Sequence, residues 1–212
     1  MPSSIAANPV WPSPSRFALA LAIAFTVTLT VTWSGGQVLI EALLPLVHSL
    51  LGWMDDRFGI LFLGVEHDKQ DSIVRLRTTI VQLFVMGGQV IEAQPQGWME
   101  VTTTLGAMLQ PLVIAPALAA ALPGRMGTRL MRFALAALLA LGFLLIDLPL
   151  TLYAYVWDML VDNLDPNGFY PLLAWHEFMH AGGRLGIGVL LVMLVGQWIG
   201  ENGWEPGRRK NK

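Results

Sequence analysis

The residues best suited to chemistry in this chain are His176, Glu177 and His180, which form the pattern H-E-x-x-H. On a helix the two histidines lie about one turn apart, so both imidazoles face the same side and can bind one zinc ion. The glutamate between them can act as a general base on a water molecule bound to that ion. The pattern can therefore form a zinc site in which His176 and His180 are ligands and Glu177 is the catalytic base.

Continued through Ala181, Gly182 and Gly183, the pattern resembles the signature of zincin metalloproteases. Gly183 matches the glycine of the longer metzincin form, whereas Gly186 stands where that form has a third histidine. The resemblance spans about eight residues, and it implies zinc-dependent hydrolysis. A third ligand would have to come from elsewhere in the chain, and the candidates are Asp158, Asp162, Asp165, His48, His67 and Glu100.

The composition indicates the environment of these residues. Of 212 residues, 54% are hydrophobic, 13% are charged, and none is cysteine. Charged residues make up about a quarter of a soluble domain, so this chain has too few to cover a surface exposed to water. The 13 basic and 15 acidic residues leave no positive excess to hold a polyanion, so no nucleic-acid partner is expected. We therefore expect an integral membrane protein.

Four apolar segments are long enough to be transmembrane helices, which need about 20 residues each. We predict an all-α integral membrane protein with four transmembrane helices and a small extracytoplasmic β-hairpin element between the first two. The predicted parts are a cytoplasmic N-terminal tail at 1–16, transmembrane helix 1 with an interfacial helix at 17–53, an extracytoplasmic β-hairpin segment at 54–100, transmembrane helix 2 at 101–122, a cytoplasmic basic loop at 123–132, transmembrane helix 3 at 133–157, an extracytoplasmic loop at 158–170, an interfacial entry with transmembrane helix 4 at 171–200, and a cytoplasmic basic tail at 201–212.

The segment 54–100 has a pattern that favours strands. Apolar and polar residues alternate across 75–80, which indicates a strand with one buried face. The polar run at 66–71 predicts the turn of a hairpin, and a third strand is expected at 89–92. A lone hairpin is only marginally stable in water, so we expect this one to pack on a helix, the membrane surface or a partner.

Two charged residues fall inside the predicted spans, at similar depth below the outer boundary: Asp147 and Arg184. A charge on the lipid face costs about 2.5–3.5 kcal/mol or more, so we predict an Asp147–Arg184 ion pair. It is interpreted first as a packing contact and second as part of a proton or substrate relay. Gly182 and Gly186 form G-x-x-x-G, which predicts close helix packing, either inside the chain against helix 3 or in a dimer.

The histidine pattern also has a structural interpretation, which is the favoured one. A helix that starts after Pro171 would emerge at the outer interface, where histidine and glutamate are stable without a metal ion. On this interpretation no cofactor is expected, and zinc remains the alternative.

Basic residues predict the orientation. Arg16, the arginines within 123–132 and the basic residues within 208–212 fall on one side of a four-span protein. Such residues favour the cytoplasmic side. Both termini are therefore expected in the cytoplasm, with the protein in a bacterial inner (plasma) membrane.

Three functions follow from these observations. The first is a non-enzymatic accessory or scaffold subunit, which associates with a membrane protein partner or with itself. The layout is similar to that of helper proteins encoded beside exosortases, which implies a companion of such a processing system, because the catalytic cysteine of those enzymes is absent. The second is a zinc-dependent membrane hydrolase or protease. The third is an oligomeric small transporter or channel that uses Asp147 and Arg184.

Overall fold

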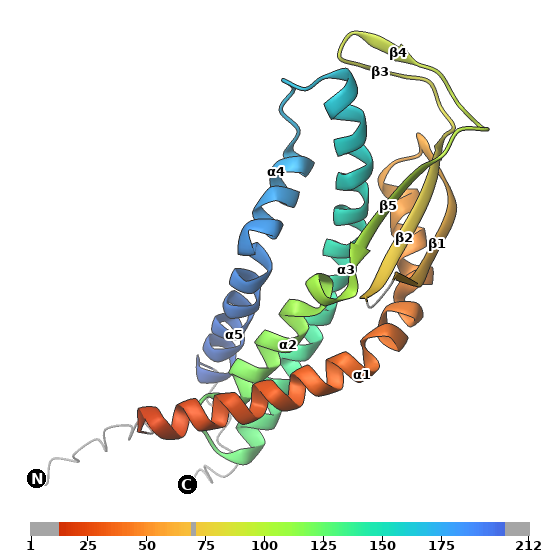
Figure 1. Ribbon diagram of the computed structural model, residues 1–212. Coiled ribbons are helices and arrows are strands. Elements are labelled where there is room, and N and C mark those ends of the chain that lie inside the picture. The colour runs from red at the N-terminus through yellow and green to blue at the C-terminus, as the bar shows by residue number, and fades with distance from the viewer. Residues whose placement is uncertain (1–12, 69–70, 202–212) are drawn as a thin grey trace, which may run out of the picture.

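The computed structural model of the chain describes residues 13–68 and 71–201, so most of the two predicted cytoplasmic tails lies outside the described residues. Figure 1 shows an elongated helical bundle with a β-sheet against one end of it. The elements are α1 (Pro14–Met54), β1 (Phe58–Asp68), β2 (Asp71–Ile80), β3 (Phe84–Met86), β4 (Gln89–Ile91), β5 (Met99–Thr104), α2 (Leu105–Ala121), α3 (Met126–Leu164), α4 (Pro171–Phe178), the π-helical turn η1 (Met179–Gly183) and α5 (Arg184–Glu201).

Three helical segments are long and apolar enough to cross a membrane: α1, α3 and the segment Pro171–Ile199 that contains α4 and α5. They support the prediction of a membrane protein. Helix α2 has 17 residues, which span about 26 Å and fall short of a hydrocarbon core of about 30 Å. The prediction of four spans is therefore not confirmed.

The expected second span loses its first residues to a strand. Strand β5 (Met99–Thr104) pairs antiparallel with β2 and runs directly into α2. Val101 and Thr103 are buried while Thr102 and Thr104 are exposed, which is the period of a strand. β-Branched residues favour strands, and pairing with β2 satisfies the backbone hydrogen bonds that a helix would otherwise have made.

The outer segment folds into a three-stranded antiparallel sheet in the order β1–β2–β5. The alternation predicted at 75–80 is confirmed over 75–78, because Leu76 and Thr78 are buried while Arg75 and Arg77 lie on the other face. It ends at Thr79, which is buried and donates a hydrogen bond to the Gln94 carbonyl. The strand expected at 89–92 exists as β4, but it pairs with β3 in a separate hairpin. The third strand of the main sheet is β5, whose residues 101–104 lie where the sequence predicts the start of transmembrane helix 2.

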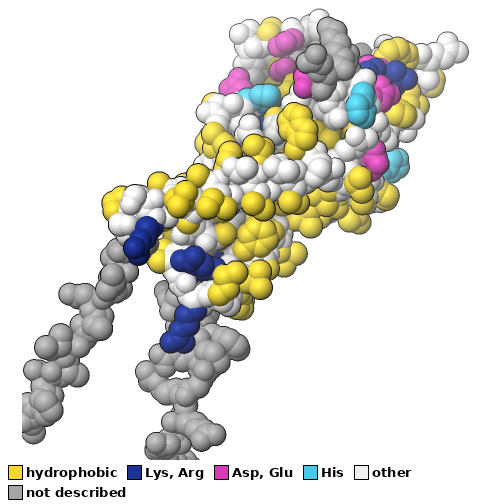
Figure 2. Space-filling view, turned by 60° about the horizontal axis from the view of Figure 1, so that its bottom comes forward, with side chains coloured by type: hydrophobic (Ala, Val, Ile, Leu, Met, Phe, Trp, Pro, Cys, Tyr) yellow, Lys and Arg dark blue, Asp and Glu magenta, His cyan; other side chains and the backbone are white. Residues whose placement is uncertain are grey.

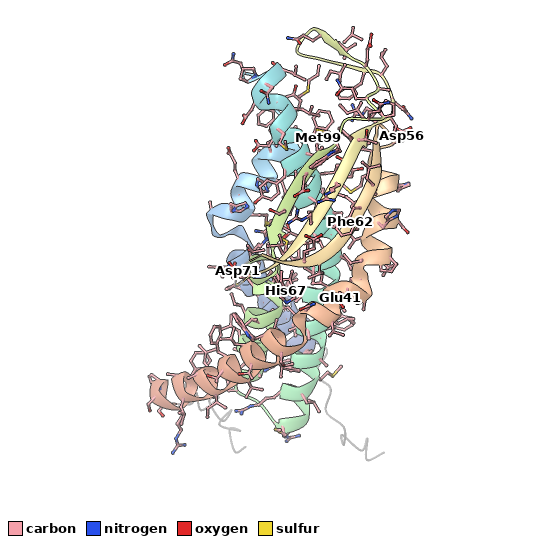
Figure 3. The ribbon with its side chains drawn as sticks, turned by 45° about the vertical axis from the view of Figure 1, so that its right-hand side comes forward. Glu41, Asp56, Phe62, His67, Asp71 and Met99 are labelled. Carbon is pink, nitrogen blue, oxygen red and sulfur yellow. The ribbon has the colours of Figure 1, made fainter. Side chains whose placement is uncertain are left out.

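The sheet continues the core of the helices. Figure 3 shows Met99 and Asp56 at one end of the sheet, and His67 and Asp71 at the end where β1 turns into β2. The buried face of the sheet shares one hydrophobic cluster with α1 and α3, whose members include Leu51, Leu76, Leu148 and Val101. One core therefore joins the sheet to the two long helices.

Helix α1 is continuous, so the expected separation into a transmembrane and an interfacial helix is not found. The helix bends along its length (Figure 1) and contains Pro45, which cannot donate a backbone hydrogen bond and kinks helices. It meets α2 at Gly36, because a Cβ atom there would come within 2.5 Å of Leu109 Cδ1. Helix α3 is longer than the predicted span 133–157 at both ends.

Candidate functional site

Six polar residues recur at intervals of four along two neighbouring helical segments. We call them the polar ladder: Asp147, Thr151 and Tyr155 on α3, with His176, His180 and Arg184 on α4, η1 and α5. Residues four apart share one face of a helix, so each segment can turn its three polar side chains toward the other. The ladder runs from a buried ion pair at one end to an exposed histidine toward the other.

The buried end of the polar ladder is the Asp147–Arg184 ion pair. Arg184 Nε donates a hydrogen bond to Asp147 Oδ2 over 2.7 Å, and Arg184 Nη2 donates to Thr151 Oγ1 over 2.8 Å. Asp147 and Thr151 are 0% exposed, and Arg184 is 2% exposed. The structure thus brings together the two charges whose pairing the sequence predicts. Thr151 was missed, although its spacing of four from Asp147 could have indicated it.

The other end of the polar ladder is built around Tyr155, which the sequence analysis also missed. Tyr155 Oη and His180 Nε2 lie 2.9 Å apart. The His176 ring stands edge-on to the rings of Tyr155 and His180, with centroids 4.4 Å apart in each case. His176 is buried, and its Nδ1 has no hydrogen-bond partner among the described residues. His180 and Glu177 are exposed.

These side chains meet only part of what a catalytic zinc ion needs. Such an ion takes three protein ligands and a water molecule. His176 and His180 supply two imidazoles, but the described residues contain no cluster of three histidine, aspartate or glutamate side chains that could hold a metal ion. None of the six third-ligand candidates from the sequence completes a set within the part of the chain that the structure describes.

The second histidine of the pattern does not lie on a regular α-helix. Helix α4 ends at Phe178, and His180 falls in η1, where Gly182 has a φ of +106°. This left-handed conformation is costly for residues with a Cβ atom and accessible to glycine. Gly182 therefore allows the chain to kink between α4 and α5.

The predicted packing pair, Gly182 and Gly186, makes no close helix contact within the described chain, since a Cβ atom on either would meet nothing within 4 Å. Gly188 packs closely instead, because its Cβ atom would lie 3.2 Å from Ile114 Cγ2 of α2. The close packing expected of these two glycines against α3 is therefore not seen, although α5 contacts both α2 and α3. The dimer alternative for Gly182 and Gly186 stays a prediction.

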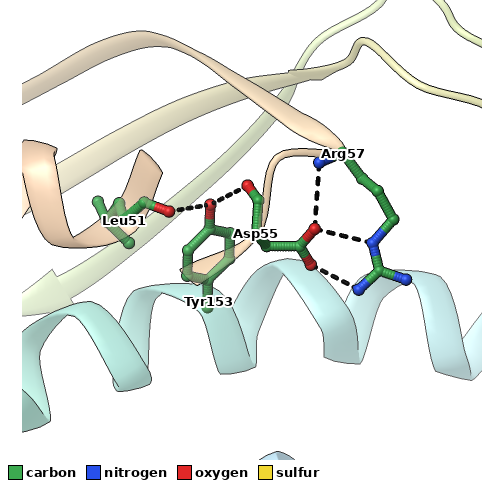
Figure 4. Close-up of polar contacts among 4 residues, drawn as sticks. All are labelled: Leu51, Asp55, Arg57 and Tyr153. Carbon is green, nitrogen blue, oxygen red and sulfur yellow. Dashed lines mark hydrogen bonds and ion pairs between the residues drawn. The ribbon is translucent and has the colours of Figure 1, made fainter. Parts of the chain in front are cut away.

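A second aspartate–arginine pair lies where α1 meets the sheet (Figure 4). Arg57 donates to Asp55 through Nε and Nη2, over 2.8 and 2.7 Å, and through its backbone N–H. Tyr153 of α3 places its hydroxyl 2.8 Å from the Leu51 carbonyl and 3.1 Å from the Asp55 carbonyl. The hydrogen bond to Asp55 raises the pKa of the Arg57 guanidinium, against the opposing effect of burial.

Aromatic rings surround this outer pair and tie the sheet to α3. The Arg57 guanidinium lies over the rings of Trp157 and Phe84, 4.9 and 5.3 Å from their centroids. Phe58 of β1 contacts Phe84, Tyr153 and Trp157, with ring centroids about 6 Å apart. The outer strands are thereby fixed to the end of a membrane-length helix.

A cleft of about 650 Å³ opens between the last turns of α3 and the β3–β4 hairpin. Its walls combine amide side chains with apolar ones, among them Gln94, Trp98 and Asn163. The hairpin turn rests on the end of α3, because a Cβ atom on Gly87 would collide with the Leu164 carbonyl oxygen. Neither the cleft nor the second ion pair was expected, because both depend on contacts between distant segments.

Comparison with known proteins assigns the chain to no family. No protein-family model matches it, and neither a curated protein nor a solved structure does. Chemically, the polar ladder can hold two helices together, and its imidazole and phenol groups can also bind or pass a proton.

Proposed function

We propose that this protein is a non-enzymatic accessory or scaffold subunit of a membrane complex, such as a companion of an exosortase-like processing enzyme. The observation that carries this proposal is an outer module, the three-stranded sheet with the β3–β4 hairpin, whose core and aromatic contacts join it to α1 and α3. A module held in this way can position another protein at a defined height above the bilayer.

Exposed apolar side chains on the outer module support a protein partner. Val85 and Val90 lie opposite each other in the hairpin and are 65% and 60% exposed, and Trp98 is 61% exposed. Helix α3 has 39 residues, about 58 Å, which is roughly twice the thickness of a hydrocarbon core. Its last turns, which line the cleft beside Val90 and Trp98, would therefore extend beyond the lipid tails. A partner would cover these side chains in place of lipid.

The pairing within the polar ladder supports a structural role as well. Arg184 is paired with Asp147 and Thr151, and Tyr155 is paired with His180. Paired polar groups in a membrane hold helices in one relative rotation, because any other rotation would expose them to lipid.

Purification of the tagged full-length protein in a mild detergent tests this proposal. We expect a partner at a fixed ratio, and we expect Val90→Asp to lower its recovery at least tenfold. Thr102→Asp is the matched control, because it adds the same charge at an exposed position of the three-stranded sheet, beside Arg75 and outside the hairpin. Recovery of the wild type only as an isolated monomer would count against the proposal.

We further propose a plasma-membrane location with both termini in the cytoplasm. Arg16 at the start of α1 and the arginines of the α2–α3 turn support it, since these ends lie together in Figure 1. The chain has no cysteine, so single cysteines at Ser13 and Glu92 can report sidedness. A membrane-impermeant maleimide on intact cells should label Glu92→Cys and leave Ser13→Cys unlabelled until lysis. The reverse result would invert the orientation.

A zinc-dependent hydrolase is the second proposal, and the close approach of His176 and His180 favours it. A bound zinc ion would activate water, but the described residues provide two of the three protein ligands required. Metal analysis of the purified wild type and of His180→Ala decides the matter. Glu92→Ala is the control, because Glu92 is exposed and is not a ligand candidate. Stoichiometric zinc in the wild type that is lost in His180→Ala would support the zinc hydrolase. Absence of zinc from the wild type would contradict it.

An oligomeric transporter or channel is the third proposal, and the burial of Asp147 favours it. Ionisable groups inside a membrane often belong to proton or ion pathways. Flux into vesicles that contain the purified protein is the measurement. A flux that is present in the wild type and abolished in Asp147→Asn would support this function. A flux that is unchanged in Asp147→Asn would contradict it.

A further inference from the structure

The turn between α2 and α3 carries three arginines without acidic neighbours. We call Arg125, Arg129 and Arg132 the arginine cluster. The sequence from 101 to 146 contains no aspartate or glutamate, and none of the three arginines forms an ion pair within the described residues. Figure 2 shows basic side chains at this end of the molecule among hydrophobic ones, with the acidic side chains in view gathered at the other end. The positive charge of the cluster is thus uncompensated inside the described chain.

Two atoms of the arginine cluster are buried without a hydrogen-bond partner. Arg132 Nη1 donates to the Pro123 carbonyl over 3.0 Å, which folds this side chain back over the turn. The Nε atoms of Arg129 and Arg132 are both buried and have no partner among the described residues. Buried N–H groups nearly always have a hydrogen-bond acceptor, so these two can donate to the oxygen atoms of a bound ligand.

The length of α3 sets the depth of the arginine cluster. Helix α3 begins at this turn and has 39 residues, about 58 Å, which is roughly twice the hydrocarbon core of about 30 Å. Its last turns carry the outer hairpin, because Gly87 lies against Leu164, and the arginine cluster lies at its other end. We therefore expect the cluster near the phosphates of the leaflet opposite the sheet.

The start of α3 adds positive potential at the same place. Its first turn contains no acidic residue, and the N-cap residue Arg125 makes no side-chain capping hydrogen bond. The N–H groups of the first turn of a helix carry a partial positive charge. An anion beside this turn would be attracted by both the guanidinium groups and the helix.

We propose that the arginine cluster binds the phosphate group of an anionic phospholipid in this leaflet. The planar guanidinium offers N–H donors in a fork that matches two phosphate oxygens. A lipid with a net negative charge is preferred to a zwitterionic one, because the cluster lacks a carboxylate to bind a choline headgroup. This site is independent of the proposed scaffold function, since it lies at the other end of the molecule from the outer module.

Native mass spectrometry of the full-length protein in mild detergent tests the site. Phosphatidylglycerol and phosphatidylcholine are the probes, and the number of retained lipids is the readout. We expect the wild type to retain phosphatidylglycerol, and Arg129→Gln with Arg132→Gln to weaken its binding by about thirtyfold. Arg77→Gln on the outer sheet is the matched control and should bind as the wild type does. Equal retention of both lipids by the wild type, or unchanged binding by the double variant, would overturn the proposal.

Two further measurements separate lipid binding from its alternatives. Arg129→Lys with Arg132→Lys keeps the charge but lacks the Nε–H donors, so we expect intermediate binding of phosphatidylglycerol. A variant that has the same melting temperature as the wild type in phosphatidylcholine is folded. If the Arg129→Gln, Arg132→Gln double variant is not folded, the single variant Arg129→Gln replaces it. An excess of inorganic phosphate should displace little phosphatidylglycerol. Full displacement of phosphatidylglycerol would assign the site to free phosphate and overturn the proposal of a lipid site.

Discussion

Two aspartate–arginine pairs stabilise this protein, one between membrane helices and one at the base of the outer sheet. Asp147 and Arg184 belong to different helices, and their side chains are 1% and 2% exposed. Asp55 and Arg57 are two residues apart, and their side chains are 9% and 37% exposed. The shortest N–O distance is 2.7 Å in both pairs. The same shortest distance is therefore found in two different environments.

The environment decides how much each pair contributes. A buried charge that loses its partner is left in a medium of low polarity, so removing one member of the inner pair is strongly destabilising. Water and salt can screen the outer pair, and its two members are already close in sequence. The inner pair thus determines which faces of two helices meet, whereas the outer pair strengthens a junction that aromatic packing already forms.

The largest effect is expected for Asp147→Ala, which leaves Arg184 without its acidic partner. We expect the free energy of unfolding to fall by about 3–5 kcal/mol, measured by reversible denaturation in detergent micelles. Asp147→Leu combined with Arg184→Met removes both charges and is expected to recover most of that loss. If Asp147→Ala alone were as stable as the wild type, burial would not make the inner pair more important than the outer pair.

A smaller effect is expected for Tyr153→Phe, which removes the hydroxyl that binds the Leu51 and Asp55 carbonyls. Loss of this buried hydrogen bond should lower the free energy of unfolding by about 1 kcal/mol. Tyr155→Phe is the matched control, because it makes the same change on the same helix beside the exposed His180. A larger loss for Tyr155→Phe would mean that the polar ladder, rather than the outer junction, depends on its tyrosine.

The smallest effect is expected for Asp55→Asn, because Arg57 is partly exposed and the pair is screened. We expect a loss of about 0.5 kcal/mol at low salt, and less at high ionic strength. Thermal unfolding of wild type and variant across a salt series measures the difference. A loss that matches that of Asp147→Ala and does not respond to salt would place both pairs in the same environment.

Patterns that repeat along the chain were predictable. The long apolar segments at α1, α3 and α5 follow from composition, and the alternation at 75–78 follows from strand geometry. The Asp147–Arg184 pair was predictable because lipid gives isolated charges no partner. The structure described for 101–104 was not, since these uncharged residues directly precede an apolar helical segment and become a strand through pairing with β2.

The candidate site was predictable only in part. His176 and His180 were found from their spacing, whereas Tyr155 and Thr151 are ordinary residues until α3 is placed opposite them. The packing glycine was misassigned for the same reason, because the neighbour of Gly188 is α2.

The amino-acid sequence by itself determined that this chain belongs in a membrane and which of its charges must be neutralised there. Those conclusions depend on solvent transfer, which each segment undergoes independently of the others. Only the tertiary structure decided that β5 joins the sheet, that Tyr153 anchors the end of α1, and that a cleft forms over α3. These features depend on hydrogen bonds and packing between residues far apart in the chain, whose partners no local pattern specifies.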